Sequence, residues 1–176
     1  YGPAIEAWLD TPGGVVVAPN GDVYVADSNT HVIRRIDAQN TTIEPVAGNH
    51  DSGSGFSGDN GLAIAAQLDT PDGVAIAPDG DLIVADSHNG RIRRVDQPTG
   101  VIATIAGSGE DGYDGDDRPA LQAALDTPSA VAAASNGDIY IADTLNNRIR
   151  VIAHATGRIY TVAGTGETAE NGEPIG

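Results

Sequence analysis

The chain has 176 residues, and its 9 Arg, with no Lys, stand against 25 Asp plus Glu for a formal net charge of −16. So acidic a surface repels phosphate groups, which argues against nucleic acid and anionic membranes as partners. The lack of Cys excludes disulfides and thiolate metal sites, and no apolar run approaches the roughly 18 residues of a membrane-spanning helix.

Two short motifs recur three times along the chain. Leu-Asp-Thr-Pro begins at Leu9, Leu68 and Leu125. Ala-Asp followed by Ser or Thr begins at Ala26, Ala85 and Ala142. Both series step by 59 and then 57 residues, and such a period predicts a repeat architecture. A residue that recurs in every repeat is first of all one that each structural unit needs.

Each repeat predicts four short strands separated by tight turns. In chain order the strands are expected at 15–18, 23–26, 32–36 and 42–47, then at 74–77, 82–86, 91–95 and 101–106, then at 130–134, 139–142, 148–152 and 159–163. The runs are β-branched or alternate polar with apolar residues, and Pro78-Asp79-Gly80 is typical of the turns between them. Units of four antiparallel strands predict an all-β fold, a β-propeller with three blades in this chain.

The expected organisation is a single repeat region, 1–176, with blades at about 12–47, 71–106 and 128–163. The connections between blades are long, and their first halves are Gly-rich and acidic. Their second halves, 62–68 and 119–125, are Ala-rich and predict a turn or two of helix. The terminal segments 1–11 and 164–176 match the second and first halves of such a connection.

The matching ends suggest how a ring could close. If the end of one copy were followed by the start of a second, Val162 and Leu9 would be 23 residues apart. The equivalent separations inside the chain are 22 residues, from Val46 to Leu68, and 20 residues, from Ile105 to Leu125. Three blades alone would expose apolar faces, and two copies related by a two-fold axis would make six blades. We therefore expect a homodimeric six-bladed ring. The alternative is half of a longer chain, or an excised or designed half-propeller with a purely architectural role.

Two segments resemble the NHL repeat family, namely 84–93 (VADSHNGRIR) and 141–150 (IADTLNNRIR). The linker 53–59 is similar to the connections of bacterial NHL proteins and of the teneurin NHL domain. The first repeat departs from the pattern, with His31 and Val32 in place of Gly90 and Arg91. The resemblance implies a propeller of about six blades. Some NHL-like propellers are lyases with metal-bound His, so a lyase or hydrolase with a metal at the channel mouth is kept as an alternative function.

The repeated charged residues are interpreted first as structural. Asp27, Asp86 and Asp143 follow the second strand of each repeat and are expected to accept hydrogen bonds from the next turn. The Arg residues of the third strand are expected to form ion pairs. A ring of Arg side chains at one face could also bind an anion. The candidate binding residues are therefore Arg34, Arg93 and Arg150.

Metal and catalytic candidates are few. The oxygen-rich linkers would suit calcium at Asp59, Asp114 and Asp116, although their spacing is not that of an EF-hand and solvated turn carboxylates are the alternative. The His residues, His31, His50, His88 and His154, hold unlike positions and show no metal-ligand spacing. No cofactor and no catalytic residue are predicted. We expect a non-enzymatic scaffold that binds a protein or small ligand at a propeller face, with no prediction of its compartment.

Overall fold

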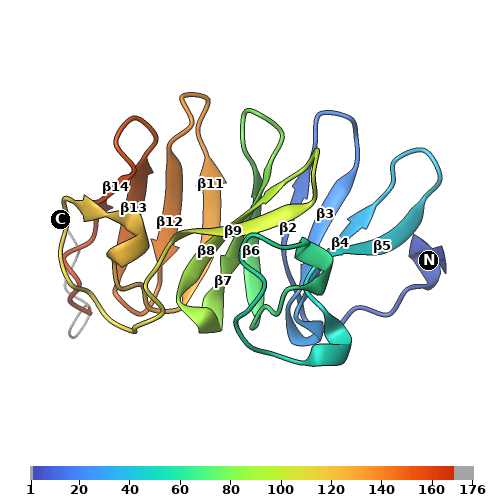
Figure 1. The fold of residues 1–176 in the computed structure, drawn as a ribbon, viewed down its shortest axis with the longest axis horizontal. Coiled ribbons are helices and arrows are strands. Elements are labelled where there is room, and N and C mark those ends of the chain that lie inside the picture. Colours follow the sequence, from blue (N-terminus) through green and yellow to red (C-terminus); the bar gives the residue numbers. More distant parts are fainter. Residues whose placement is uncertain (1, 169–176) are drawn as a thin grey trace.

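Three antiparallel sheets lie side by side in the computed structural model, which describes residues 2–168 (Figure 1). Blade 1 consists of β2 (Pro12–Val17), β3 (Val23–Asp27), β4 (Val32–Ile36) and β5 (Thr42–Ala47). Blade 2 consists of β6 (Pro71–Ile76), β7 (Leu82–Asp86), β8 (Arg91–Asp96) and β9 (Val101–Ala106). Blade 3 consists of β11 (Pro128–Ala133), β12 (Ile139–Asp143), β13 (Arg148–Ala153) and β14 (Arg158–Ala163). Each is a meander of neighbouring antiparallel strands, which confirms the predicted all-β blades.

Each blade has a turn face and a linker face. The turn face, at the top of Figure 1, carries the hairpin turns between the first two and the last two strands. The linker face, at the bottom, carries the turns between the second and third strands and the long linkers between blades. On the turn face Asp22, Asp81 and Asp138 each accept a main-chain N–H from the neighbouring hairpin turn, at 2.8–3.1 Å. The two turns of a blade are thereby tied together.

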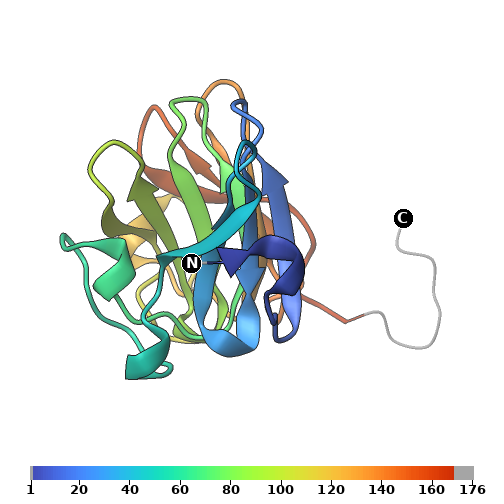
Figure 2. The ribbon, with the colours of Figure 1, turned by 90° about the vertical axis from the view of Figure 1, so that its right-hand side faces the viewer.

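The linkers run along the outermost strand of the blade that follows them. Strand β1 (Gly2–Pro3) pairs with β5 near the N-terminus (Figure 2), β10 (Arg118–Pro119) pairs with β14, and Leu62 bridges to Val101. Two of the sheets therefore gain a fifth strand that the sequence did not predict.

The Ala-rich halves form single 3-10 turns rather than a longer helix. The turns are η1 (Ala4–Glu6), η4 (Ala63–Ala65) and η6 (Ala120–Gln122), while η2, η3 and η5 (Ser28–Thr30, His50–Ser52 and Ser87–Asn89) lie elsewhere on the linker face. The physical reason is that the backbone of this segment bonds to the blades: Ala63 donates to the carbonyl of Gly100 and accepts from the N–H of Gly48. A continuing helix would use the same groups internally. No helix within residues 2–168 has the length and apolar character needed to cross a membrane.

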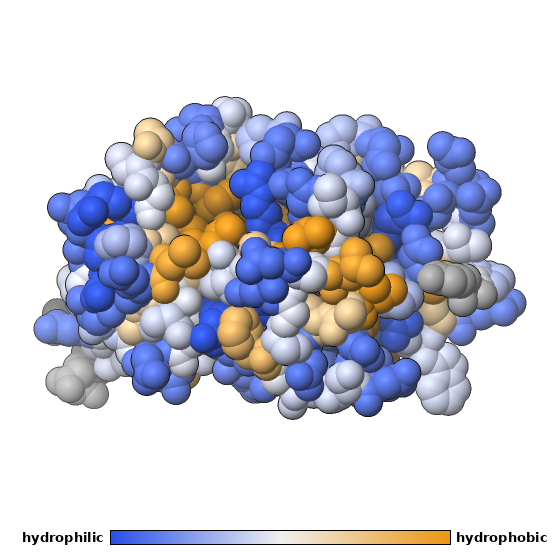
Figure 3. Space-filling view, viewed as in Figure 1, coloured by the Kyte–Doolittle hydropathy of each residue, from blue (hydrophilic) through white to orange (hydrophobic). Residues whose placement is uncertain are grey.

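Two cores hold the blades together. Alternate residues of blade 2 face opposite neighbours, as strand geometry requires: Leu82 and Val84 pack against blade 1, whereas Ile83 and Ala85 pack against blade 3. Leu68 and Leu125, each at the end of a linker, are fully buried at these interfaces. In the view of Figure 1, apolar side chains gather across the middle of the molecule, between hydrophilic rims at the turn and linker faces (Figure 3).

The outer faces of blades 1 and 3 carry apolar residues like those of the buried blade interfaces, but no blade packs against them within residues 2–168. Val15 and Val17 on β2 are 63% and 64% exposed, while the equivalent of Val15 in blade 2, Val74, is buried. On blade 3, Tyr140 and Ile149 are exposed in the same way. These two open faces lie at opposite ends of the row of blades (Figure 1).

Candidate functional site

A clamp of charged and aromatic side chains holds the linker to blade 2 on the linker face. Arg93 on β8 is fully buried; its Nη1 lies 3.1 Å from Asp86 Oδ2 and its Nη2 lies 2.8 Å from Asp59 Oδ1. Nη2 also donates to the carbonyl of Ser57 at 3.1 Å. The ring of Phe56 stacks against Arg93 and its neighbour on the strand, Arg91, with guanidinium–centroid distances of 4.8 and 3.8 Å. We use the word clamp for this set: strand-end Asp, strand Arg, linker carboxylate and linker aromatic.

Blade 3 repeats the clamp with different residues in the same places. Arg150 binds Asp143 at 3.2 Å and Asp116 at 3.1 Å, and it donates to the carbonyl of Gly115. Tyr113 stacks on Arg150 at 4.8 Å and on the preceding strand Arg at 3.8 Å. The cation–π distances equal those of blade 2, so the two linkers are fixed by one device. The signal for it in the sequence is aromatic-x-Gly-Asp at 56–59 and 113–116, which sequence reasoning did not use.

The strand-end Asp is held mainly from the preceding linker. Asp86 Oδ1 accepts the main-chain N–H of Asp69 at 2.8 Å, and the following turn contributes only the side chain of Asn89. The following turn therefore contributes a hydrogen bond, as expected, and the preceding linker adds a main-chain N–H beside the buried Leu68 that the sequence did not predict. Burial raises the pKa of Asp86 to about 6, against the opposing effects of these hydrogen bonds and of Arg93.

The same position in blade 3 behaves alike. Burial raises the pKa of Asp143, which accepts hydrogen bonds from Asp126 N–H and Asn146 and lies beside Arg150. In blade 1, Asp27 accepts the N–H of Asp10 at 2.7 Å. The strand-end Asp is therefore a linker anchor in all three blades.

The clamp of blade 1 is open. Arg34 Nε lies 2.7 Å from Asp27 Oδ2, but within residues 2–168 neither terminal nitrogen of Arg34 has a carboxylate, carbonyl or aromatic partner. Its side chain is 23% exposed, whereas Arg93 and Arg150 are fully buried. Three further positions differ from the filled clamps: they hold Thr30, Val32 and Pro45 where blade 2 has Asn89, Arg91 and Thr104.

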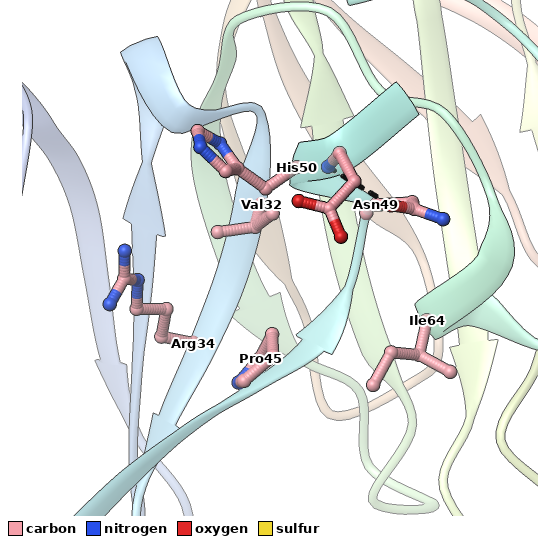
Figure 4. Close-up of a pocket in the computed structure, with 8 residues that line it drawn as sticks. Val32, Arg34, Pro45, Asn49, His50 and Ile64 are labelled. Carbon is pink, nitrogen blue, oxygen red and sulfur yellow. Dashed lines mark hydrogen bonds between the residues drawn. The ribbon is translucent and has the colours of Figure 1, made fainter. Parts of the chain in front are cut away.

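A cavity of about 350 Å³ lies at the open clamp (Figure 4). Val32 and Pro45 lie on neighbouring strands, Arg34 lies at one rim, and Ile64 and His50 approach from the next linker. The cavity occupies the place where the filled clamps have an Arg beneath an aromatic ring. It can receive an apolar group next to an anionic one.

The anion-binding prediction for Arg34, Arg93 and Arg150 stays a prediction. Within residues 2–168, Arg93 and Arg150 are fully buried in ion pairs, whereas Arg34 is partly exposed and its terminal nitrogens bind no carboxylate.

The calcium prediction also stays a prediction. Asp59 and Asp116 are engaged by the clamp Arg residues, while Asp114 binds Arg118 at 2.5 Å and accepts the N–H of Ala124. In the part of the chain that the structure describes, no three His, Asp or Glu side chains gather as a metal site would require.

The His residues lie in different places. Asp69 Oδ1 lies 3.7 Å from His31 Nδ1 and 3.6 Å from His88 Nδ1, and His31 Nδ1 also accepts the N–H of Thr70 at 3.1 Å. His50 lines the open clamp, and His154 is on the turn face. The pairing of His31 and His88 around one carboxylate was not visible from the sequence, because the three residues come from two blades and a linker.

Comparison with known proteins starts from the repeats. The family model described as NHL repeat matches residues 9–36, 68–95 and 125–152. The chain is 33% identical over 146 residues to Protein SUPPRESSOR OF QUENCHING 1, chloroplastic, of Arabidopsis thaliana, and 32% identical over 164 residues to human Teneurin-4. It is 31% identical over 155 residues to NHL repeat-containing protein 2 of Bos taurus. These matches cover 80%, 84% and 84% of this chain but only 14%, 6% and 21% of the relatives.

Solved structures support the fold. A protein of unknown function from Bacteroides thetaiotaomicron superposes with a TM-score of 0.66 at 23% identity, over 78% of this chain and 34% of that one. Streptogramin B lyase superposes with a TM-score of 0.55 at 17% identity, over 85% and 39%. At these identities the likeness concerns the fold alone. With three matching repeats, each seen here as one four-stranded blade, the chain belongs to the NHL-repeat family of β-propellers.

Proposed function

We propose that this chain is a non-enzymatic binding scaffold whose linker face receives a protein or small ligand. The observation that supports this proposal is the repeated clamp. It uses the recurrent Asp and Arg residues to fix the linkers, so the charges that look most like chemistry serve to hold loops in place. Fixed loops lose little conformational entropy on binding, which favours recognition.

The scaffold test compares the two faces of the molecule. Replacing the linker residues Glu110 and Asp111 by Ser changes the linker face without touching a clamp, whereas replacing Asp96 and Gln39 by Ser changes the turn face. A ligand of the linker face should be lost with the first variant and retained by the second, measured by calorimetry or pull-down with a defined partner. Equal loss from both variants, or catalytic turnover by the native chain, would contradict the proposal.

We also propose that two copies close a six-bladed ring. Tyr140 and Ile149 on the outer face of blade 3 hold the positions that, in blade 2, pack against the following blade. Val15 and Val17 on the outer face of blade 1 hold the positions that, in blade 2, pack against the preceding blade. Ser87 Oγ, in the turn after β7, donates to the carbonyl of Pro128 across a blade interface at 2.7 Å. The equivalent Thr144 is exposed, its hydroxyl lies 2.5 Å from that of Ser129, and in the proposed ring it would face blade 1 of a second copy.

Light scattering coupled to size exclusion tests the ring. The expected mass is twice 17.9 kDa. Val17→Asp places a charge on an open face and should give a monomer, whereas Leu121→Asp, at an exposed position on η6 away from both open faces, should leave the mass unchanged. A native chain that stays monomeric at high concentration would rule out ring closure by a second copy.

A further inference from the structure

We propose that the open clamp of blade 1 takes the segment 170–173 of a second copy, with Glu173 as the carboxylate that binds Arg34. This inference rests on the ring closure proposed above and adds to it a specific contact between the copies. The segment lies outside the described residues, so the argument uses its sequence and the geometry of the site that receives it.

The receiving site is built but incomplete. In the filled clamps one terminal nitrogen of the strand Arg binds a linker carboxylate, at 2.8 Å in blade 2 and 3.1 Å in blade 3. Asp27 is bound by Arg34 Nε, whereas a terminal nitrogen makes this contact in the filled clamps, and within residues 2–168 the terminal nitrogens of Arg34 bind no carboxylate. A partly buried guanidinium gains most from an ionised acceptor, so the site favours an acidic side chain.

The third linker repeats the spacing of the second. From Gly107 the sequence reads GSGEDGYDGD, and from Gly164 it reads GTGETAENGE. Glu173 therefore aligns with Asp116, the carboxylate of the clamp in blade 3, and Gly172 aligns with the Gly whose carbonyl that clamp also binds.

The direction of the linkers selects a second copy as the source. Each filled clamp is closed by the linker that precedes its blade: 53–59 closes blade 2 and 110–116 closes blade 3. The third linker leaves blade 3 at one end of the row, while Arg34 belongs to blade 1 at the other end (Figure 1). In a ring of two copies, blade 1 of the partner is the blade that follows.

The two sides of this clamp have changed together. The segment has Glu170 where the filled clamps have Phe56 and Tyr113, and blade 1 has Val32 where they have an Arg beneath the ring. Both members of the cation–π pair are thus replaced at once. The charge pair between Arg34 and Glu173 is the part of the clamp that remains, and it would make the joint between copies different from the joints inside a chain.

Cysteine cross-linking of mixed variants tests the contact, since the native chain has no Cys. Pro45 occupies the position of Thr104, whose hydroxyl binds the clamp carboxylate Asp59 at 2.8 Å. A mixture of Pro45→Cys and Glu173→Cys chains should give a covalent heterodimer under mild oxidation, while either variant alone should give none. Asn40→Cys on the turn face replaces Pro45→Cys in the control mixture and should not cross-link.

A charge reversal measures the strength of the contact in the full chain. Glu173→Arg should raise the dissociation constant of the dimer about tenfold or more, since one charge-assisted contact is lost at each of two joints. Glu167→Arg, in the same linker but outside the clamp, should change it less than about twofold at the same salt concentration.

The outcomes separate the two proposals. A dimer that is insensitive to Glu173→Arg and gives no Pro45–Glu173 cross-link would overturn this inference and leave ring closure intact. Cross-linking of Asn40→Cys to the same extent would overturn it as well. A monomeric native chain would overturn both.

Discussion

The clamps of blades 2 and 1 share the strand-end Asp and the strand Arg. They differ in the carboxylate and the aromatic ring that the linker provides in blade 2. In blade 2, Arg93 is buried between Asp86 and Asp59 under the ring of Phe56. In blade 1, Arg34 keeps the strand-end Asp but lies partly exposed beside a cavity. The difference shows that burial of the Arg is conferred by the loop that covers it. The strand alone provides only the position.

The largest expected effect comes from removing the cation of the filled clamp. Arg93→Met leaves Asp86 buried without its partner, and we expect a loss of about 3–5 kcal/mol in the free energy of unfolding. Arg158→Met, in the exposed pair of Arg158 with Asp117, should cost far less, because water and salt screen a surface ion pair. Urea unfolding at one fixed protein concentration measures both. Equal losses would mean that the clamp contributes no more than a surface ion pair.

The buried end of a linker provides the next comparison. Leu125→Ala should lower the free energy of unfolding by about 2–5 kcal/mol, because a fully buried side chain leaves a cavity between blades 2 and 3. Leu9→Ala, at the equivalent but exposed position before blade 1, should cost less than about 1 kcal/mol in dilute protein. If the ring forms, the cost of Leu9→Ala should grow with protein concentration. Equal costs in dilute protein would contradict the contrast between closed and open interfaces.

The aromatic of the clamp should have a smaller effect. Phe56→Ala removes the ring from two guanidinium groups and should cost about 1 kcal/mol. It should also speed amide hydrogen exchange in the linker 53–59. Phe56→Tyr is the control, since Tyr113 has this role in blade 3 at the same distances. Exchange rates unchanged in Phe56→Ala would show that the ring does not hold the linker.

The last comparison concerns the protonation of two carboxyl groups. The pKa of Asp86 is raised to about 6 in the folded protein, so between about pH 4 and pH 6 the folded state holds a proton that the unfolded state has lost. The stabilising contribution of this group is complete below the ordinary Asp pKa and is lost as the pH rises through about 6. The carboxyl ¹³C shift of Asp86 should titrate near pH 6, while hydrogen bonds from Thr99 lower the pKa of Asp96, so its shift should titrate at a lower pH than an ordinary Asp. A midpoint for Asp86 below that of Asp96 would refute this.

Much of the fold could be predicted because its signals are local. The period of the repeats, the alternation within strands and the Pro- and Gly-containing turns each involve residues a few positions apart. The linker path and the clamp could not be predicted in this way. They join Arg93 to Asp59 across 34 residues and Asp86 to the N–H of Asp69 across 17, and no local pattern reports which side chain will cover which.

The sequence by itself determined the three blades, because β-strand periodicity dictates two apolar faces for each of them. It could not distinguish Arg34 from Arg93 and Arg150, which occupy one repeated position in nearly identical strands. Only the tertiary structure decided that two are buried and one is open, because the burial of a charge depends on the carboxylates and rings that distant loops bring to it.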